Sequence, residues 1–226
     1  MEKIIIIGPA HPLRGGGMVT FNQRLAQELI NSGYDCNIVS FSLQYPSFFF
    51  PGKTQTSNEP PPSSLKIRSL INSINPINWI IVGNKIRKEK PDLIIVRFWI
   101  PVLGLALGTI LRIIKKNTHS KIICIADNII PHEKRWGDKL FTRYFLKSCD
   151  AFITMSEQVL NDLKKFKITS PAKLEPHPLY DNFGESLTKQ AARNILQLEP
   201  TDKIILFFGF IRAYKGLDLL LNAMAD

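Results

Sequence analysis

Acidic residues are scarce in this chain of 226 residues. Aspartate and glutamate together number 19 against 29 lysines and arginines, so the formal net charge at neutral pH is +10. Such an excess favours anionic partners, namely phosphates, nucleic acids or an anionic membrane surface, without choosing among them. The composition, 45% hydrophobic and 21% charged, is that of a globular protein and excludes general disorder. At about 150 residues per domain, the length predicts one complete domain and part of a second.

Cysteines and long apolar runs are also few. The three cysteines, Cys36, Cys124 and Cys149, form no CxxC pair, so the sequence predicts buried thiols in a reducing compartment rather than disulfides or a zinc site. The apolar run at residues 4–7 is too short for a secretory signal. The longest uncharged stretch, residues 98–111, falls short of the roughly 20 residues that span a bilayer. We therefore expect a cytoplasmic protein that touches a membrane at most peripherally.

Several signatures of catalysis and binding are absent as well. Neither GxGxxG nor GxxxxGK(S/T) occurs, which argues against a dinucleotide fingerprint and against a P-loop nucleoside triphosphatase. His11, His119 and His177 lack the spacing of metal ligands. No nucleic-acid-binding motif accompanies the positive charge. We therefore expect no metal, no resident cofactor and no nucleic-acid partner.

Short β-rich runs alternate with amphipathic helical segments. Residues 4–7 are continuously apolar, as in a strand buried on both faces, and Phe21, Leu25 and Leu29 share one side of a helix predicted at 18–31. This alternation predicts the α/β class, with a doubly wound, Rossmann-like parallel sheet whose ligands bind at the carboxyl ends of the strands. Further strands are expected at 36–41, 92–96, 121–125, 151–154 and 172–175, and helices at 77–88, 102–115, 134–147 and 156–166.

Two segments interrupt the alternation. Residues 42–65 are predicted to form a long irregular loop. Its three consecutive phenylalanines either belong to the core or, if exposed, form an apolar surface that favours binding to other molecules. After residue 176, a turn-rich segment leads to a helix at 188–196, a strand at 203–208 and a helix at 217–225, which repeat the opening motif. The expected parts are a Rossmann-like domain at 1–176, a linker with a connecting helix at 177–202, and the start of a second α/β domain at 203–226.

Three glycines, Gly15, Gly16 and Gly17, stand directly before the first predicted helix. They permit positive φ angles and close approach of the backbone to a ligand. Because a helix N-terminus adds free N–H groups and a partial positive charge, this loop is a candidate phosphate site. The alternative is a flexible loop whose glycines only permit a tight turn.

Two further clusters are candidate binding or catalytic groups. Arg212 and Lys215 lie in a turn before a helix, where two cations could clamp a diphosphate or remain solvated. Residues 127–133 follow a predicted strand, at the edge where this fold places its ligand contacts. Within them, Asp127 or Glu133 could accept a proton or bind hydroxyls, His132 titrates near neutrality, and Asn128 could bind a ligand. The alternative is that Asp127 caps a turn and that His132 and Glu133 begin the next helix.

The predicted helix at 134–147 is basic and amphipathic. Lys139, Arg143 and Lys147 recur every four residues, opposite a side that carries aromatic residues and Leu140. Such a helix can lie on an anionic membrane. The alternative is a helix packed on the core with a solvated basic face.

In this order and spacing, the motifs resemble the retaining, nucleotide-sugar-dependent glycosyltransferases of family four, which are of GT-B type. Residues 8–17 with Phe21 and Asn22 are similar to the N-terminal glycine loop of that family. Residues 127–133 are similar to its motif after a central strand, and residues 208–218 to the opening of its nucleotide-binding domain. The resemblance implies two Rossmann-like domains facing a cleft, the first binding a glycan or lipid-linked acceptor and the second a nucleotide-sugar. It also implies transfer with retention and without a metal, in polysaccharide or glycolipid assembly.

The resemblance implies roles for the candidate residues. Arg212, Lys215 and the amides of the glycine loop would stabilise the leaving nucleoside diphosphate. Asp127 stands where many members carry a histidine, and an ionised carboxylate cannot donate a hydrogen bond. We take Asp127, His132 and Glu133 as candidate catalytic residues, and Gly15, Gly16, Gly17, Asn128, Arg212 and Lys215 as candidate donor-binding residues.

The paired acidic motif of the family would lie beyond Asp226. We therefore expect the chain to be a fragment or one half of a split enzyme, and to be inactive alone. The alternative from another class is a non-catalytic acceptor-binding half that needs a partner or the missing domain.

Overall fold

The chain forms two units, which we describe separately. In the computed structural model, the described residues are 1–14, 16–45, 56–58, 60–131, 135–179, 184–209, 211 and 215–225. The first unit is Met1–Pro178 and the second is Leu179–Asp226. The phenylalanines at 48–50 lie outside the described residues, so the two interpretations of that segment stay open.

A parallel sheet of seven strands organises the first unit. Its strand order is β3-β2-β1-β4-β5-β6-β7, and every neighbouring pair is parallel. This is the order of a doubly wound Rossmann-like fold, which confirms the predicted α/β class. The strands are β1 (Lys3–Ile7), β2 (Asp35–Leu43), β3 (Ile67–Asn72), β4 (Leu93–Phe98), β5 (Lys121–Ala126), β6 (Ala151–Thr154) and β7 (Ala172–Leu174).

The continuous apolar run of β1 fills both faces of the sheet. Ile5 and Ile7 belong to the core on one face, whereas Ile4 and Ile6 belong to the core on the other. All four side chains are almost completely buried. Each contributes roughly 1.5–3 kcal/mol through the burial of its apolar surface. Burial on both faces explains why β1 shows no alternation of polar and apolar residues.

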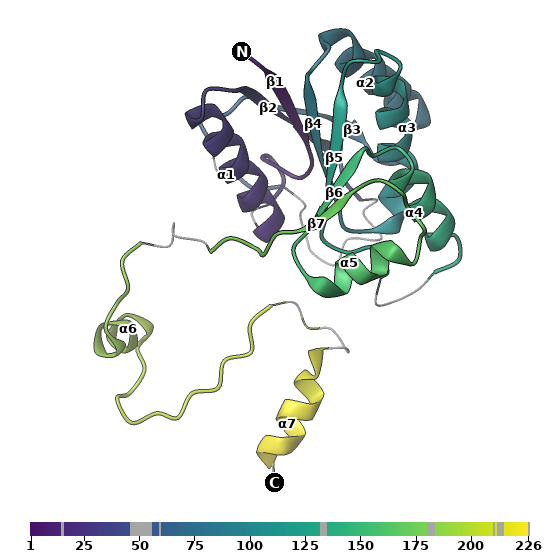
Figure 1. Ribbon diagram of the computed structural model, residues 1–226. Coiled ribbons are helices and arrows are strands. Elements are labelled where there is room, and N and C mark those ends of the chain that lie inside the picture. Colours follow the sequence, from purple (N-terminus) through teal and green to yellow (C-terminus); the bar gives the residue numbers. More distant parts are fainter. Residues whose placement is uncertain are drawn as a thin grey trace. The chain divides into compact units, whose positions relative to one another are not determined.

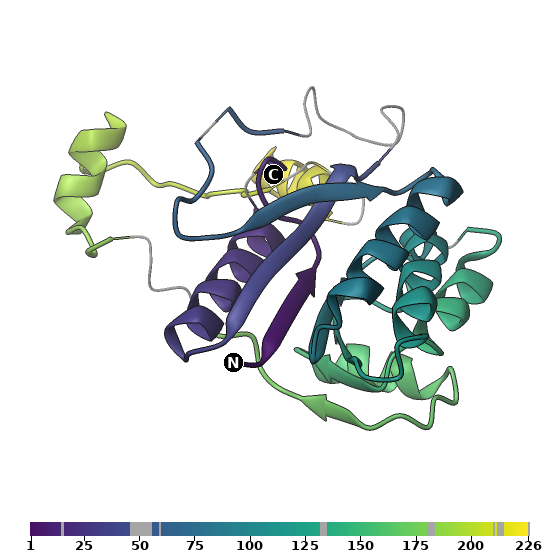
Figure 2. The same ribbon diagram turned by 90° about the horizontal axis from the view of Figure 1, so that it is seen from above.

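Helices lie on both faces of this sheet. Helix α1 covers one face, and Figures 1 and 2 show it on the opposite side of the sheet from α2, α3 and α4. Helix α5 supplies Val159 and Leu163 to the same core as α2 to α4. The helices are α1 (Gly17–Asn31), α2 (Pro76–Glu89), α3 (Gly104–Lys115), α4 (Asp138–Leu146) and α5 (Glu157–Lys164), and the 3₁₀ turn η2 (Pro101–Leu103) precedes α3.

Strand β3 was not predicted from the sequence. It lies at the edge of the sheet, and of its six residues only Ile71 is buried. Its pairing with β2 also contains register shifts. A half-exposed edge strand lacks the continuous apolar run that marks β1, so its composition is close to that of the preceding loop.

In the second unit, the predicted strand at 203–208 is wrong. These residues form no strand, and the side chains of Leu206 and Phe208 are largely exposed. A strand requires hydrogen bonds to a neighbour, and no strand occurs among the described residues of this unit. Its regular elements there are α6 (Lys189–Leu196) and α7 (Leu217–Ala225), close to the predicted helices.

The described residues contain no candidate membrane-spanning helix and no disulfide. No helix there combines the length and the apolar character needed to cross a bilayer. All three cysteines are buried and free, as predicted. Burial, helped by the negative charge of Asp35, raises the pKa of Cys36 to about 11. Burial likewise raises the pKa of Cys124 well above its usual value.

These thiols are expected to react slowly in the native chain, because the thiolate is the nucleophile and burial disfavours it. With a disulfide reagent such as Ellman's at pH 8, the native chain should release little thionitrobenzoate over minutes. The same chain in concentrated urea should react at all three cysteines. Rapid reaction of three thiols per native chain would contradict the buried placement.

Candidate functional site

Some of the predicted site residues lie at the carboxyl edge of the sheet. Strands β1 and β4 are neighbours, and the connections from them lead to helices on opposite faces of the sheet. A doubly wound sheet binds its ligands at such a point of reversal. Gly8 follows β1 here, Arg97 is the penultimate residue of β4, and Asp127 follows β5.

Arg97 and Asp127 form a buried ion pair. The guanidinium donates from Nε and from Nη2 to the two carboxylate oxygens, each at 2.5 Å. The Arg97 side chain is 3% exposed and that of Asp127 is 19% exposed. A charge removed from water requires a partner of opposite sign, and Asp127 supplies it in a bidentate geometry.

Sequence reasoning did not single out Arg97. The sequence nevertheless marked it, because Arg97 is a charged residue within an otherwise apolar strand. Its guanidinium carbon lies 4.1 Å from the centre of the Phe21 ring on α1, in a cation–π contact. Its third nitrogen, Nη1, is buried and has no hydrogen-bond partner among the described residues. A buried donor without a partner costs stability, so this edge retains one strong donor unused.

Close packing brings α1 against this ion pair. A Cβ atom at Gly8 would lie 2.7 Å from Nδ2 of Asn22, so that amide would have to shift, and 3.1 Å from Cβ of Arg97, which is a tight contact. Asn22 donates from Nδ2 to the carbonyl of Pro9 at 2.8 Å. Glycine at position 8 therefore allows the first turns of α1 to approach β4.

The loop after β1 is fixed by polar side chains. Ser40 Oγ accepts a hydrogen bond from the amide of Ala10, and Gln23 Oε1 accepts one from the amide of His11. Gly16 is the N-cap of α1 and provides no side-chain cap. Its φ of 175° is an extended conformation that any residue adopts, and no atom of the described residues lies within 4 Å of a Cβ placed there. Nothing in the described part of the chain thus requires glycine at position 16, whereas a ligand approaching the helix N-terminus would.

The structure positions only some of the predicted residues. Asp127 engages both carboxylate oxygens with Arg97, and Asn128 follows it, half-buried. Gly17 is the first residue of α1. His132 and Glu133 lie outside the described residues, as do Gly15 and Arg212.

Lys215 belongs to the second unit. Its Nζ would lie 2.8 Å from a Cβ at Gly209, so the amine closes over that glycine, whose φ is 116°. The two units are described separately, so the clamp predicted between the glycine loop and Lys215 stays a prediction.

No metal site is evident in the part of the chain that the structure describes. There, no group of three or more His, Cys, Asp or Glu side chains is arranged to hold an ion.

Comparison with known proteins gives a family match. A family model described as Glycosyltransferase Family 4 matches residues 15–178. No curated protein matches the sequence.

Several solved structures are similar at low identity. UDP-N-acetylglucosamine 2-epimerase from Rickettsia bellii has 13% identity and a TM-score of 0.48, over 76% of this chain and 44% of that one. An alpha-glucosyltransferase in complex with UDP and a 13-mer DNA has 14% identity and a TM-score of 0.48, over 76% and 40%. Sucrose-phosphate synthase from Thermosynechococcus elongatus has 12% identity and a TM-score of 0.45, over 86% and 96%. The chain spans less than half the length of the first two, and its fold assignment rests on the sheet order.

Removal of the Asp127 carboxylate is expected to destabilise the first unit, because Arg97 would stay buried without a counter-charge. The Asp127→Ala variant should lose about 3 kcal/mol of unfolding free energy, measured by urea denaturation. The control is Glu175→Ala, which breaks the exposed ion pair with Lys173 and should cost less than about 1 kcal/mol. Equal losses of unfolding free energy in the two variants would show that the buried pair stabilises the fold no more than an exposed one.

Proposed function

The chain belongs to glycosyltransferase family 4, and on this premise we propose that it transfers a sugar from a nucleotide-sugar to a glycan or lipid-linked acceptor, with retention of the anomeric configuration. The observation that carries the proposal is the carboxyl edge of the sheet. There, α1 begins without a side-chain cap, and about one helical turn later its Phe21 contacts the buried guanidinium of Arg97. The helix N-terminus and the guanidinium both attract negatively charged oxygen atoms.

The proposed donor site holds the diphosphate of the nucleotide-sugar. The N-terminus of α1 carries a partial positive charge of about half an elementary charge. Amides of the loop at Gly15, Gly16 and Gly17 approach the phosphates without obstruction from side chains. We assign Arg212 and Lys215, which belong to the second unit, as further cations of the donor site. Together they stabilise the negative charge that develops on the leaving diphosphate, as a metal ion does in metal-dependent transferases.

The transfer step breaks the bond between the anomeric carbon and the donor phosphate oxygen. A new bond forms from that carbon to an acceptor hydroxyl oxygen, and the hydroxyl proton passes to a base. In this proposal His132 and Glu133 lie on the acceptor side and handle that proton. Asp127, already ion-paired with Arg97, and the neighbouring Asn128 orient the donor sugar. Residues 1–176 then form the acceptor-side domain, and residues 203–226 begin the donor-side domain.

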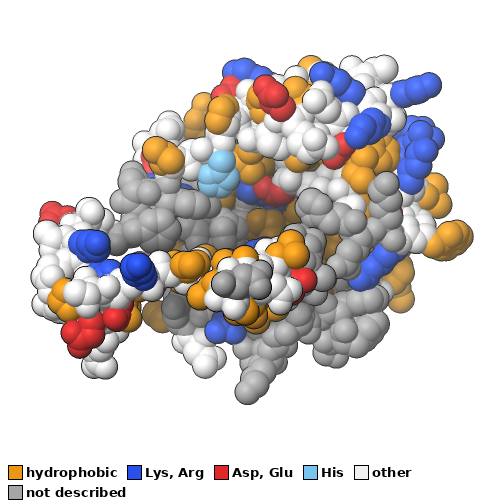
Figure 3. All heavy atoms as spheres, turned by 90° about the horizontal axis from the view of Figure 1, so that it is seen from below, with side chains coloured by type: hydrophobic (Ala, Val, Ile, Leu, Met, Phe, Trp, Pro, Cys, Tyr) orange, Lys and Arg blue, Asp and Glu red, His pale blue; other side chains and the backbone are white. Residues whose placement is uncertain are grey.

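We also propose a location at the cytoplasmic surface of a membrane. The helix predicted at 134–147 begins at Asp138, and of its predicted apolar side Phe145 is buried whereas Leu140 is exposed. Trp136, before the helix, is 97% exposed, and Leu140 is 65% exposed, so both share the surface with Lys139 and Arg143. Lys and Arg side chains gather along one edge of the face in Figure 3, with exposed hydrophobic side chains among them. Such a mixture suits an anionic interface.

Donor binding is tested by placing a carboxylate at the helix N-terminus. Gly16→Asp should keep α1 stable, since aspartate is a good N-cap, but should repel phosphate. We expect it to weaken nucleotide-sugar binding by about tenfold or more, measured by calorimetry or by the ligand-induced rise in melting temperature. The matched control is Ser156→Asp at the N-cap of α5, which should leave binding unchanged. Unchanged binding in Gly16→Asp would remove the glycine loop from the donor site.

Metal-free transfer with retention is tested on the protein isolated from its source. Radiolabelled sugar should continue to reach a lipid or glycan fraction in the presence of EDTA, because the cations of the chain stabilise the leaving group. Proton NMR of the product should show the anomeric configuration of the donor. Loss of transfer in EDTA would overturn the metal-free mechanism, and an inverted product would overturn retention alone.

A further inference from the structure

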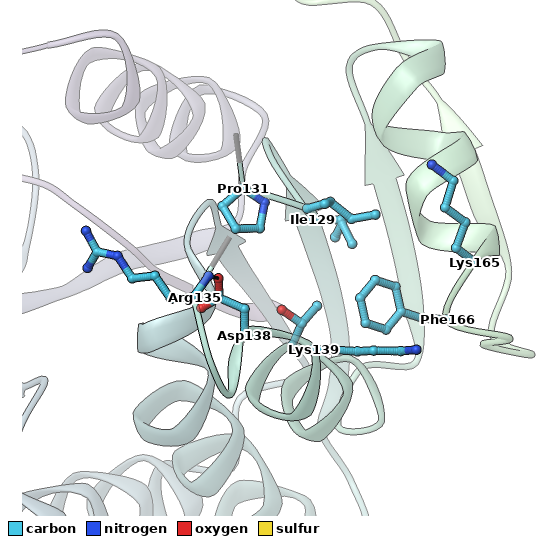
Figure 4. Close-up of a pocket in the computed structure, with 9 residues that line it drawn as sticks. Ile129, Pro131, Arg135, Asp138, Lys139, Lys165 and Phe166 are labelled. Atoms are coloured by element: carbon cyan, nitrogen blue, oxygen red, sulfur yellow. Dashed lines mark hydrogen bonds between the residues drawn. The ribbon is translucent and has the colours of Figure 1, made fainter. Parts of the chain in front are cut away.

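A cavity of about 320 Å³ lies beside the proposed site. It opens between the loop after β5, the start of α4 and the end of α5, and Figure 4 shows its lining residues. The loop contributes Ile129, Ile130 and Pro131, which follow Asn128 directly in the chain. Ligand pockets in proteins range from about 300 to 1,000 Å³, so the cavity is large enough for part of a small molecule.

The floor of this cavity is apolar. Ile129 is 1% exposed and Phe166 is 7% exposed, and both belong to the main hydrophobic core. In Figure 4 the Phe166 ring points toward Ile129 across the cavity. A floor made of core side chains favours an alkyl group and offers no hydrogen bonds to a sugar or to a free phosphate.

One polar atom of the lining has no partner. Thr142 on α4 is buried, and its Oγ1 makes no hydrogen bond among the described residues. A helical threonine ordinarily bonds its hydroxyl to a carbonyl one turn earlier. A buried hydroxyl without a partner costs stability, so its presence in the lining points to a ligand that carries an acceptor oxygen.

The rim of the cavity carries a positive charge. Lys139 and Lys165 flank Phe166 in Figure 4, and Arg135 also lines the cavity. Asp138 is the one carboxylate among the described residues of the lining, and its Oδ2 accepts a hydrogen bond from the amide of Arg135. Lys165 is ion-paired with Asp162 outside the lining. The rim therefore complements an anion, whereas the floor complements hydrocarbon.

The apolar surface continues outward from the rim. Trp136 and Leu140 border a shallower depression next to the cavity, together with Lys139 and Arg143. Both apolar side chains are exposed. Trp136 and Leu140 thus extend the apolar surface beyond the cavity itself.

We propose that this cavity binds a lipid phosphate, with its hydrocarbon chain against Ile129, Ile130 and Phe166 and its phosphate at the rim beside Lys139. The occupant is a single-chain amphipathic anion, such as an alkyl or polyprenyl phosphate. The role of this site rests on the proposed function, in which the lipid phosphate is the acceptor or carries it. Its position fits that role, since its first lining residue follows Asp127 and Asn128.

Binding is tested with dodecyl phosphate, added to the full chain below the concentration at which it forms micelles. We expect it to raise the melting temperature and to change the fluorescence of Trp136. Inorganic phosphate and the neutral detergent dodecyl maltoside should do neither at equal concentration. An equal response to dodecyl maltoside would reduce the cavity to a general apolar surface, and a response to inorganic phosphate would reduce it to an anion site. Either result overturns the proposal.

Two pairs of variants distinguish binding inside the cavity from general attraction to the positively charged surface. Lys139→Glu should weaken dodecyl phosphate binding roughly fivefold to tenfold, and a glutamate in the first turn of α4 favours the helix. The control Lys147→Glu makes the same charge change at the C-cap of α4, outside the cavity, and should change binding less than about twofold. Ile130→Asp should abolish binding, whereas Ile130→Val should preserve it. Equal effects of the two lysine variants would indicate attraction to a charged membrane surface alone and would overturn the proposal.

Failure of this inference is distinguishable from failure of the proposed function. The Gly16→Asp variant should bind dodecyl phosphate as the unmodified chain does, because its altered site is the proposed donor site. If nucleotide-sugars bind and dodecyl phosphate does not, the lipid phosphate site is wrong and the donor site stands. If dodecyl phosphate binds and nucleotide-sugars do not, the lipid site stands and the proposed function is wrong.

Discussion

The need of one buried guanidinium for a counter-charge organises the carboxyl edge of the sheet. Arg97 is fixed by β4, so the carboxylate that neutralises it must come from a neighbouring strand, and Asp127 after β5 meets that need. The face of the same guanidinium packs on Phe21, which ties the first turns of α1 to the pair. Three elements that are distant in the sequence are thereby held together where a doubly wound sheet binds its ligands. Among the described residues, Nη1 of Arg97 has no hydrogen-bond partner, which leaves donor capacity at this edge.

The parts of the fold that could be predicted are those with a strong periodic signal. The apolar run of β1 and the single-sided pattern of α1 define the first βα unit, and the sheet order follows from repeated units with right-handed crossovers. Strand β3 escaped because an edge strand with one buried residue has no such signal. The run at 203–208 gave a strong signal and still forms no strand, because pairing depends on neighbours that a local pattern does not report.

The candidate site could be predicted in position but only partly in composition. Strand ends and glycines indicate the edge that binds ligands, and Asp127 was found in this way. Arg97 was missed because it lies inside β4, where the sequence pattern indicates core residues and not residues of a binding site. Thr142 was missed for a different reason, because only a folded structure reveals that a hydroxyl lacks a partner. Charge patterning predicted the basic helix α4. It also placed Leu140 on an apolar side, whereas the structure exposes Leu140 beside the basic residues.

The absence of a side chain at Gly8 allows α1 and β4 to pack closely around that position. A methyl group at position 8 would crowd Nδ2 of Asn22 on α1 and Cβ of Arg97 on β4. An alanine there would push the Asn22 amide away from the Pro9 carbonyl to which it donates. The hydrogen bond that ties α1 to the loop after β1 is therefore permitted by the carbon atom that glycine lacks.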